Sequence, residues 1–160
     1  MDERTTVLYV DDNPKSSRLL ASVLEQCGFR IITKNDPVEA LMLCRRTGFD
    51  LALLDYEMPG MSGAKLAREI KHLMPDVPVV LISGRTSIPL PELEFVDAHF
   101  GFGTALDDLL WTMRILAPPK VVAREIEFFD SIAPPDRGPQ IAHPHGPGLV
   151  PEESRWADST

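Results

Sequence analysis

Short, almost wholly apolar runs alternating with helical patterns constrain the fold of this chain more than any other feature. Strands are predicted at about 6–11, 50–55 and 77–83, and weaker ones at 30–34 and 96–102. Runs with no polar alternation are typical of strands that are buried on both faces of a parallel sheet. Five strands with helical segments between them predict a doubly wound α/β domain.

Helices are predicted in the gaps between these strands. The first spans about residues 14–27 and the third about 62–74, and a second begins at the capping sequence Asp36-Pro37-Val38-Glu39 and ends at Gly48. Thr104-x-x-Asp107 reads as a capping box for the last helix. The residues expected to face inward are Leu19, Leu20, Val23, Leu24 and Cys27, then Leu66, Ile70 and Leu73, then Leu106, Leu109, Leu110 and Met113.

The fourth helical slot differs from the others. Residues 85–94 contain Pro89 and Pro91, neither of which has an N–H to donate within a helix. A fourth helix here is expected to be short, displaced or replaced by a loop.

Three acidic residues end two of the predicted strands. Asp11 and Asp12 follow the run Val7–Val10, and Asp55 follows Leu51–Leu54. In open α/β sheets, ligands bind outside the carboxyl ends of the strands. Three carboxylates brought together there would repel one another unless a cation neutralised them, and oxygen ligands suit Mg²⁺, which shares its shell with water and phosphate. The sequence therefore predicts a site for Mg²⁺ and a phosphoryl group.

The composition of the chain limits the classes of partner and the location that are expected for it. The 160 residues are 44% hydrophobic and carry a net charge of −8, which disfavours direct binding to nucleic acid or to an anionic membrane. With no membrane-spanning apolar run and no secretion signal, a cytoplasmic location is expected. Cys27 and Cys44 occur in predicted helices without a metal-binding pattern and are expected to be reduced.

The chain divides at about residue 117 into a folded domain, 1–117, and a proline-rich tail, 118–160. The tail holds eight of the 15 prolines, so it is expected to be largely irregular. Residues 121–131 are the exception, because Val122, Ile126 and Phe129 could line one side of a short helix that docks near the fifth strand. The tail shows no Arg/Lys-rich recognition helix, so no DNA-binding output domain is expected.

Three motifs together resemble the receiver domain of bacterial response regulators. They occur in the family's order and spacing, and the resemblance covers roughly residues 4–117. The motifs are Val7-Leu8-Tyr9-Val10-Asp11-Asp12-Asn13, Leu54-Asp55-Tyr56-Glu57-Met58-Pro59-Gly60-Met61-Ser62-Gly63 and Pro78-Val79-Val80-Leu81-Ile82-Ser83-Gly84. The resemblance implies a flavodoxin-like sheet with strand order 2-1-3-4-5. It also implies a sensor histidine kinase or phosphotransfer protein as one partner and a downstream protein as another.

Roles for individual residues follow from the resemblance. Asp55 matches the aspartate that accepts a phosphoryl group and forms an acyl phosphate. Asp12 matches a direct Mg²⁺ ligand, Asp11 its partner that holds metal-bound water, and Glu57 supplies a backbone carbonyl ligand. Ser83 matches the hydroxyl that hydrogen-bonds the new phosphoryl oxygen.

One family position is replaced in this chain. Receivers normally carry a lysine at the end of the fifth strand, where this chain has Phe102, and no lysine occurs between Lys71 and Lys120. The family's aromatic switch residue corresponds to His99. Arg85, two residues after Ser83, is the nearest residue in sequence that could replace the missing cation. The alternative interpretation is that Arg85 is only a solvated residue of the loop.

Three functions are compatible with the sequence. The first is a Mg²⁺-dependent phosphoacceptor that signals through protein contacts and catalyses only its own phosphorylation. The second is a degenerate receiver that acts as a phosphorylation-independent interaction module. The third is a Mg²⁺-dependent phosphohydrolase with an aspartate nucleophile, which is disfavoured because the chain lacks the Asp-x-Asp pattern and a capping domain.

Overall fold

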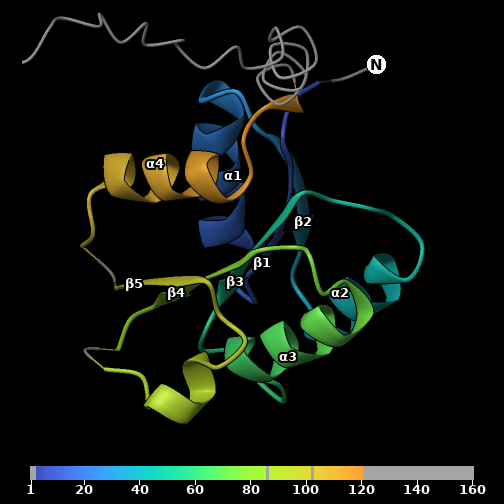
Figure 1. Cartoon of the computed structure of the whole chain (residues 1–160). Coiled ribbons are helices and arrows are strands. Elements are labelled where there is room, and N and C mark those ends of the chain that lie inside the picture. Colours follow the sequence, from blue (N-terminus) through green and yellow to red (C-terminus); the bar gives the residue numbers. More distant parts are fainter. Residues whose placement is uncertain (1–2, 86, 102, 121–160) are drawn as a thin grey trace, which may run out of the picture.

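Five parallel strands form the centre of the molecule (Figure 1). The computed structural model describes residues 3–85, 87–101 and 103–120. The strands are β1 (Thr6–Val10), β2 (Arg30–Lys34), β3 (Leu51–Asp55), β4 (Val79–Ser83) and β5 (Ala98–Gly101). Their order is β2-β1-β3-β4-β5, so the predicted doubly wound sheet and the strand order implied by the resemblance are both confirmed.

Four α-helices cover the two faces of the sheet (Figure 1). They are α1 (Pro14–Gln26), α2 (Pro37–Cys44), α3 (Gly63–Leu73) and α4 (Leu106–Leu116). Helices α1 and α4 pack on one face, and α2 and α3 pack on the other. A sheet covered on both sides explains why its strands are apolar throughout.

The alternation of side chains along the strands divides the core between these faces. In β1, Leu8 and Val10 join the cluster beneath α2 and α3, whereas Val7 and Tyr9 join the cluster beneath α1 and α4. All four are at most 3% exposed. Burial of such side chains, at about 1.5–3 kcal/mol each, holds the strand ends in fixed positions.

Polar side chains cap the first turns of three helices, and the cap by Asp36 confirms the prediction. Asn13 accepts hydrogen bonds from Lys15 N and Ser16 N, and Asp36 accepts one from Glu39 N at 2.9 Å. Ser62 caps α3 through Lys65 N.

Two predicted helix boundaries are wrong. Helix α4 begins at Leu106, and Thr104 Oγ1 donates to Gly101 O at 2.9 Å instead of capping the helix. Helix α2 ends at Cys44, before Gly48, and Arg46 N and Thr47 N both donate to Leu43 O in the turn that follows.

Three residues predicted to face the core are exposed: Leu19, Leu73 and also Leu106, which is 39% exposed at the start of α4. Leu19 is 71% exposed because the buried stripe of α1 runs through Ser17, Ala21 and Leu24, and position 19 lies on another side of the helix. Leu73, in the last turn of α3, is 43% exposed. Ser17 belongs to the buried stripe of α1 and is 1% exposed, although it was not predicted to lie in the core.

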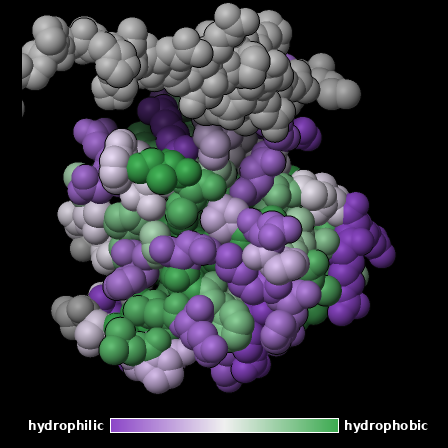
Figure 2. All heavy atoms as spheres, in the orientation of Figure 1, coloured by the Kyte–Doolittle hydropathy of each residue, from purple (hydrophilic) through white to green (hydrophobic). Residues whose placement is uncertain are grey.

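The connection from β4 to β5 contains a single 3-10 turn, η1 (Leu90–Leu93), in place of a fourth α-helix. The prediction of a shortened helix is confirmed. This segment leaves apolar side chains at the surface, seen at the lower left of Figure 2, and Leu90 is 82% exposed.

No helix within residues 3–85, 87–101 and 103–120 is long and apolar enough to cross a membrane. Cys27 and Cys44 are both free thiols, as predicted. The predicted helix at 121–131 lies outside the described residues.

Candidate functional site

The three aspartates predicted from the sequence meet at the carboxyl edge of the sheet. Asp55 is the last residue of β3, and Asp11 and Asp12 follow the last residue of the neighbouring strand β1. One carboxylate oxygen from each residue can be chosen so that all lie within 4.8 Å of one another. They lie at the point where the strand order reverses, with β2 on one side of β1 and β3 on the other.

Asp11 is fixed by hydrogen bonds to both of its carboxylate oxygens. Tyr9 Oη donates to Oδ2 at 2.7 Å, and Asn13 N donates to Oδ1 at 2.8 Å. The residue is only 7% exposed. Burial, together with the hydrogen bond to Asp11, raises the pKa of Tyr9, so this phenol remains a donor. Each carboxylate oxygen of Asp11 still has a lone pair available for a further ligand.

Asp55 has the most perturbed carboxyl group of the three. Burial raises its pKa from the ordinary 3.8 to about 6, and the charges of Asp11, Asp12 and Glu57 add to the rise. A hydrogen bond from Glu57 N to Asp55 Oδ1, 3.3 Å long, acts in the opposite direction. The ionised form is therefore held in a place where its charge is poorly compensated by the protein alone.

This arrangement fits a hard divalent cation. The donors are carboxylate oxygens, they come from two strands, and Asp12 faces solvent, which leaves room for water in the coordination shell. A bound cation would offset the repulsion that raises the pKa of Asp55. The residues present therefore fit Mg²⁺ by charge, donor type and spacing.

The aspartates open into a cavity of about 530 Å³. Its polar end holds the three aspartates with Glu57, and its apolar end is formed by Leu19, Leu20 and Val23 of α1 with Ile82 and Leu106. Asp55 therefore lines a space that a small ligand can enter.

Ser83 and His99 line a second, smaller cavity, which lies at the carboxyl ends of β4 and β5. Ser83 is the last residue of β4 and is 1% exposed, and its Oγ accepts a hydrogen bond from Arg85 N at 2.9 Å. Ser83, Arg85 and exposed His99 line a cavity of about 160 Å³. Phe102, the residue in place of the family lysine, lies outside the described residues.

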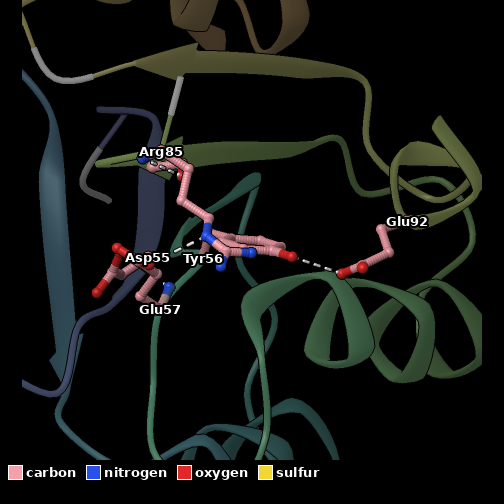
Figure 3. Close-up of polar contacts among 6 residues, drawn as sticks. Asp55, Tyr56, Glu57, Arg85 and Glu92 are labelled. Carbon is pink, nitrogen blue, oxygen red and sulfur yellow. Dashed lines mark hydrogen bonds and ion pairs between the residues drawn. The ribbon is translucent and has the colours of Figure 1, made fainter. Parts of the chain in front are cut away.

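A chain of contacts leads from the loop that follows Asp55 to η1 (Figure 3). Arg85 Nε lies 3.4 Å from Glu57 Oε1, and its guanidinium carbon lies 5.8 Å from the centre of the Tyr56 ring. Tyr56 Oη donates to Glu92 Oε2 at 2.8 Å. This hydrogen bond is the main cause that raises the pKa of Tyr56.

Three residues that shape the site were not identified from the sequence. Tyr9 orients Asp11, Asn35 Nδ2 donates to Asp11 O at 2.7 Å, and Gly63 packs directly on the end of β3. A Cβ at Gly63 would overlap the carbonyl oxygen of Asp55 and lie 2.8 Å from Leu81 Cδ1. The signal for Gly63 was present in the Met-Pro-Gly-Met-x-Gly string, and the i, i+2 spacing of Tyr9 and Asp11 places them on one face of a strand, whereas the contact of Asn35 is tertiary.

Comparison with known proteins agrees with this geometry. The family described as "Response regulator receiver domain" matches residues 7–95. The DNA-binding response regulator MtrA of Mycolicibacterium smegmatis is 32% identical over 121 residues, which cover 76% of this chain and 49% of that protein. The transcriptional regulatory protein BaeR of Escherichia coli is 33% identical over 127 residues, which cover 78% of this chain and 48% of that protein. The chain thus spans about half the length of these relatives.

Solved structures share the architecture. The response regulator TrrA of Thermotoga maritima, in complex with Mg²⁺-BeF, aligns with a TM-score of 0.66 at 29% identity and covers 70% of this chain and 98% of its own. A receiver domain protein described as CheY-like, from Methanospirillum hungatei, aligns with a TM-score of 0.64 at 25% identity, covering 78% and 98% of the two chains. Together with the sheet order and the aspartate cluster, these matches show that the chain belongs to the response regulator receiver domain family of two-component signalling.

Proposed function

We propose that Asp55 accepts a phosphoryl group from a phosphohistidine of a sensor histidine kinase or phosphotransfer protein, in a Mg²⁺-dependent reaction. The observation that carries this proposal is the meeting of Asp11, Asp12 and Asp55 within 4.8 Å at an open cavity. Two structures of TrrA, 29% identical to this chain, add support: one is in complex with Mg²⁺-BeF and the other is in complex with the histidine kinase ThkA.

In the proposed reaction, an ionised oxygen of Asp55 attacks phosphorus and forms an O–P bond. The P–N bond to the donor imidazole breaks, its electron pair stays on the nitrogen, and the product is an acyl phosphate plus neutral histidine. The pKa of Asp55, about 6 in the metal-free protein, would be lowered by a bound cation, so the attacking carboxylate is ionised at pH 7. Phosphoryl transfer otherwise needs positioning and charge stabilisation.

The other residues position the charges. Asp11, Asp12, Asp55 and the backbone carbonyl of Glu57 are the proposed ligands of Mg²⁺, which when bound neutralises charge on the phosphoryl oxygens. Tyr9 and Asn13 hold Asp11 in place. Ser83 carries a hydroxyl at the end of β4, and we propose that it turns to donate to a phosphoryl oxygen.

Signalling after phosphorylation is proposed to occur through protein contacts. A net charge of −8 disfavours direct nucleic-acid binding, and residues 118–160 hold no Arg/Lys-rich helical pattern. The apolar surface at η1, with Leu90 82% exposed, is a place where a protein partner can bind.

A second function is favoured by one observation. Because Phe102 stands where the family has lysine, the chain can be a receiver that has lost phosphorylation and binds partners constitutively. The charge-assisted contact supplied by that lysine is worth about 1.5–3 kcal/mol, and phenylalanine cannot replace it.

Incubation with acetyl phosphate and Mg²⁺, followed by intact-mass measurement, separates the two functions. The phosphoacceptor gains the mass of one phosphoryl group, Asp55→Asn gains none, and Asp50→Asn, at the opposite edge of the sheet, behaves as wild type. No adduct on the wild-type protein, with its fold confirmed by circular dichroism, would favour the degenerate receiver.

Binding of Mg²⁺ is tested separately by nuclear magnetic resonance. Titration to millimolar Mg²⁺ should shift the amides near residues 11–13 and 55–58, with weak affinity because the protein supplies only part of the shell. An absence of shifts there would contradict the proposed metal site.

A further inference from the structure

A phosphoryl group on Asp55 would lie among negative charges without the family's lysine. Asp11, Asp12 and Glu57 already surround Asp55, and their charges contribute to its raised pKa. The sequence contains no lysine between Lys71 and Lys120, so the end of β5 offers none. In addition to the proposed Mg²⁺, a cationic side chain in the place of that lysine would stabilise the phosphorylated state.

Among the residues that the structure describes, Arg85 is a cationic side chain that the fold brings to the loop after Asp55. Its backbone is tied to the end of β4, because Arg85 N donates to Ser83 Oγ at 2.9 Å. Its side chain crosses from β4 towards the loop after β3, where it meets Glu57 and the Tyr56 ring (Figure 3). Glu57 is itself only two residues from Asp55 and donates its N–H to that carboxylate.

The present contacts of Arg85 are weak enough to be exchanged. The ion pair with Glu57 is 3.4 Å long, and the side chains of Arg85 and Glu57 are 56% and 52% exposed. Exposed pairs of this kind contribute little to stability. A phosphoryl group carries more charge than a carboxylate and matches the planar fork of a guanidinium, so it competes for Arg85 effectively.

The Tyr56 ring links Arg85 to a second element. The ring is 6% exposed, lies under the guanidinium, and ends in a hydroxyl that donates to Glu92 of η1 at 2.8 Å. A cation over the face of the ring is an attractive contact, and its removal changes the environment of the ring. A continuous path of contacts therefore leads from the loop that follows Asp55 to the β4–β5 connection, through Arg85, Tyr56 and Glu92.

We propose that Arg85 is the phosphoryl-binding cation of this receiver, and that its transfer from Glu57 and Tyr56 to phosphorylated Asp55 is transmitted through the Tyr56–Glu92 hydrogen bond to η1. The inference rests on the proposed phosphorylation of Asp55. It assigns Arg85 a binding role, Glu57 the role of its partner in the unphosphorylated state, and Tyr56 the role of a positioning residue for η1.

The first test is the lifetime of the adduct after acetyl phosphate is removed, followed by intact mass. Arg85→Ala should shorten the half-life several-fold, and Arg85→Lys should restore part of it by returning the charge. Arg68→Ala, which removes an exposed arginine of α3 paired with Glu69, is the matched control and should match wild type. Glu57→Gln, which frees Arg85, should raise the adduct yield.

The outcomes separate this inference from the function on which it rests. If the wild-type protein forms no adduct on Asp55, the proposed function fails. If it forms one, and Arg85→Ala leaves both its yield and half-life unchanged, the role of Arg85 is refuted.

The second test follows η1 itself. At equal phosphorylation, amide resonances of Leu90, Glu92 and Leu93 should shift in the wild-type protein and shift much less in Tyr56→Phe, which keeps the ring but cannot donate to Glu92. The half-life of the adduct should be retained in Tyr56→Phe because Arg85 is intact. Equal shifts of η1 in the two proteins would refute transmission through Tyr56.

Discussion

Replacing Asp55 with asparagine should stabilise the metal-free protein at pH 8. The ionised carboxylate is partly buried beside Asp11 and Asp12, which raises its pKa from 3.8 to about 6. Asparagine has nearly the same shape and carries no charge, so it removes the repulsion and keeps the acceptor for Glu57 N.

The magnitude follows from linkage between protonation and folding. A pKa raised by about two pH units corresponds to about 3 kcal/mol. Solvent reaches part of this carboxyl group, so we reduce the expected gain to about 1–2 kcal/mol. A group with a raised acid pKa binds its proton more tightly in the folded state, so the folded protein loses stability as pH rises from about 4 to about 6. Above that range the penalty is constant, and near pH 5 it is about half developed.

Urea unfolding at pH 5 and pH 8, in the presence of a chelator, measures this effect. The advantage of Asp55→Asn should be largest at pH 8 and roughly halved at pH 5. Asp76→Asn, which removes a carboxylate from the exposed turn before β4, is the control and should not reproduce the gain in stability at pH 8. Refutation would be an Asp55→Asn protein that is no more stable than wild type at pH 8, or one whose advantage does not change with pH.

Three further predictions concern the site's supports and the tail. Gly63→Ala should lower the free energy of urea unfolding by about 1–3 kcal/mol, because the added Cβ would overlap Asp55 O. The control Gly48→Ala, with open space around its Cβ, should lower it far less, and equal effects would contradict the packing role of Gly63. Tyr9→Phe should weaken Mg²⁺ binding and cost about 1–3 kcal/mol, since Asp11 loses a buried donor, and an unchanged stability and affinity would show that Tyr9 does not orient Asp11. Removal of residues after Pro119 should lower thermal stability or change partner binding or oligomeric state if 121–131 docks as a short helix; if none of these changes, the segment is only a linker.

The sequence predicted the sheet and the acidic cluster because both depend on local patterns. Apolar runs such as Leu51–Leu54 identify strands buried on both faces, and the acids that end them must meet at one edge. Pro89 and Pro91 likewise predicted the loss of a full fourth helix, which the single turn of η1 confirms.

The errors arose where tertiary packing overrides local signals. Thr104 resembles a helix cap, but its hydroxyl donates to Gly101 O, and α4 begins without a side-chain cap. Leu19 resembles a core residue, but the stripe of α1 that faces the sheet contains Ser17 instead. No local pattern could have shown that Arg85 lies over Tyr56, because this contact joins the segments that follow two different strands, β3 and β4.

The most direct test of the account is to identify the residue that carries the phosphoryl group. Wild-type protein incubated with acetyl phosphate and Mg²⁺ is treated with borohydride, which reduces an aspartyl phosphate to homoserine and releases phosphate, and the product is mapped by peptide mass spectrometry. We predict homoserine at position 55 alone, and none when Mg²⁺ is chelated. Homoserine at Asp11 or Asp12, or no conversion at any position, would contradict the claim that the acidic cluster makes Asp55 the phosphoacceptor.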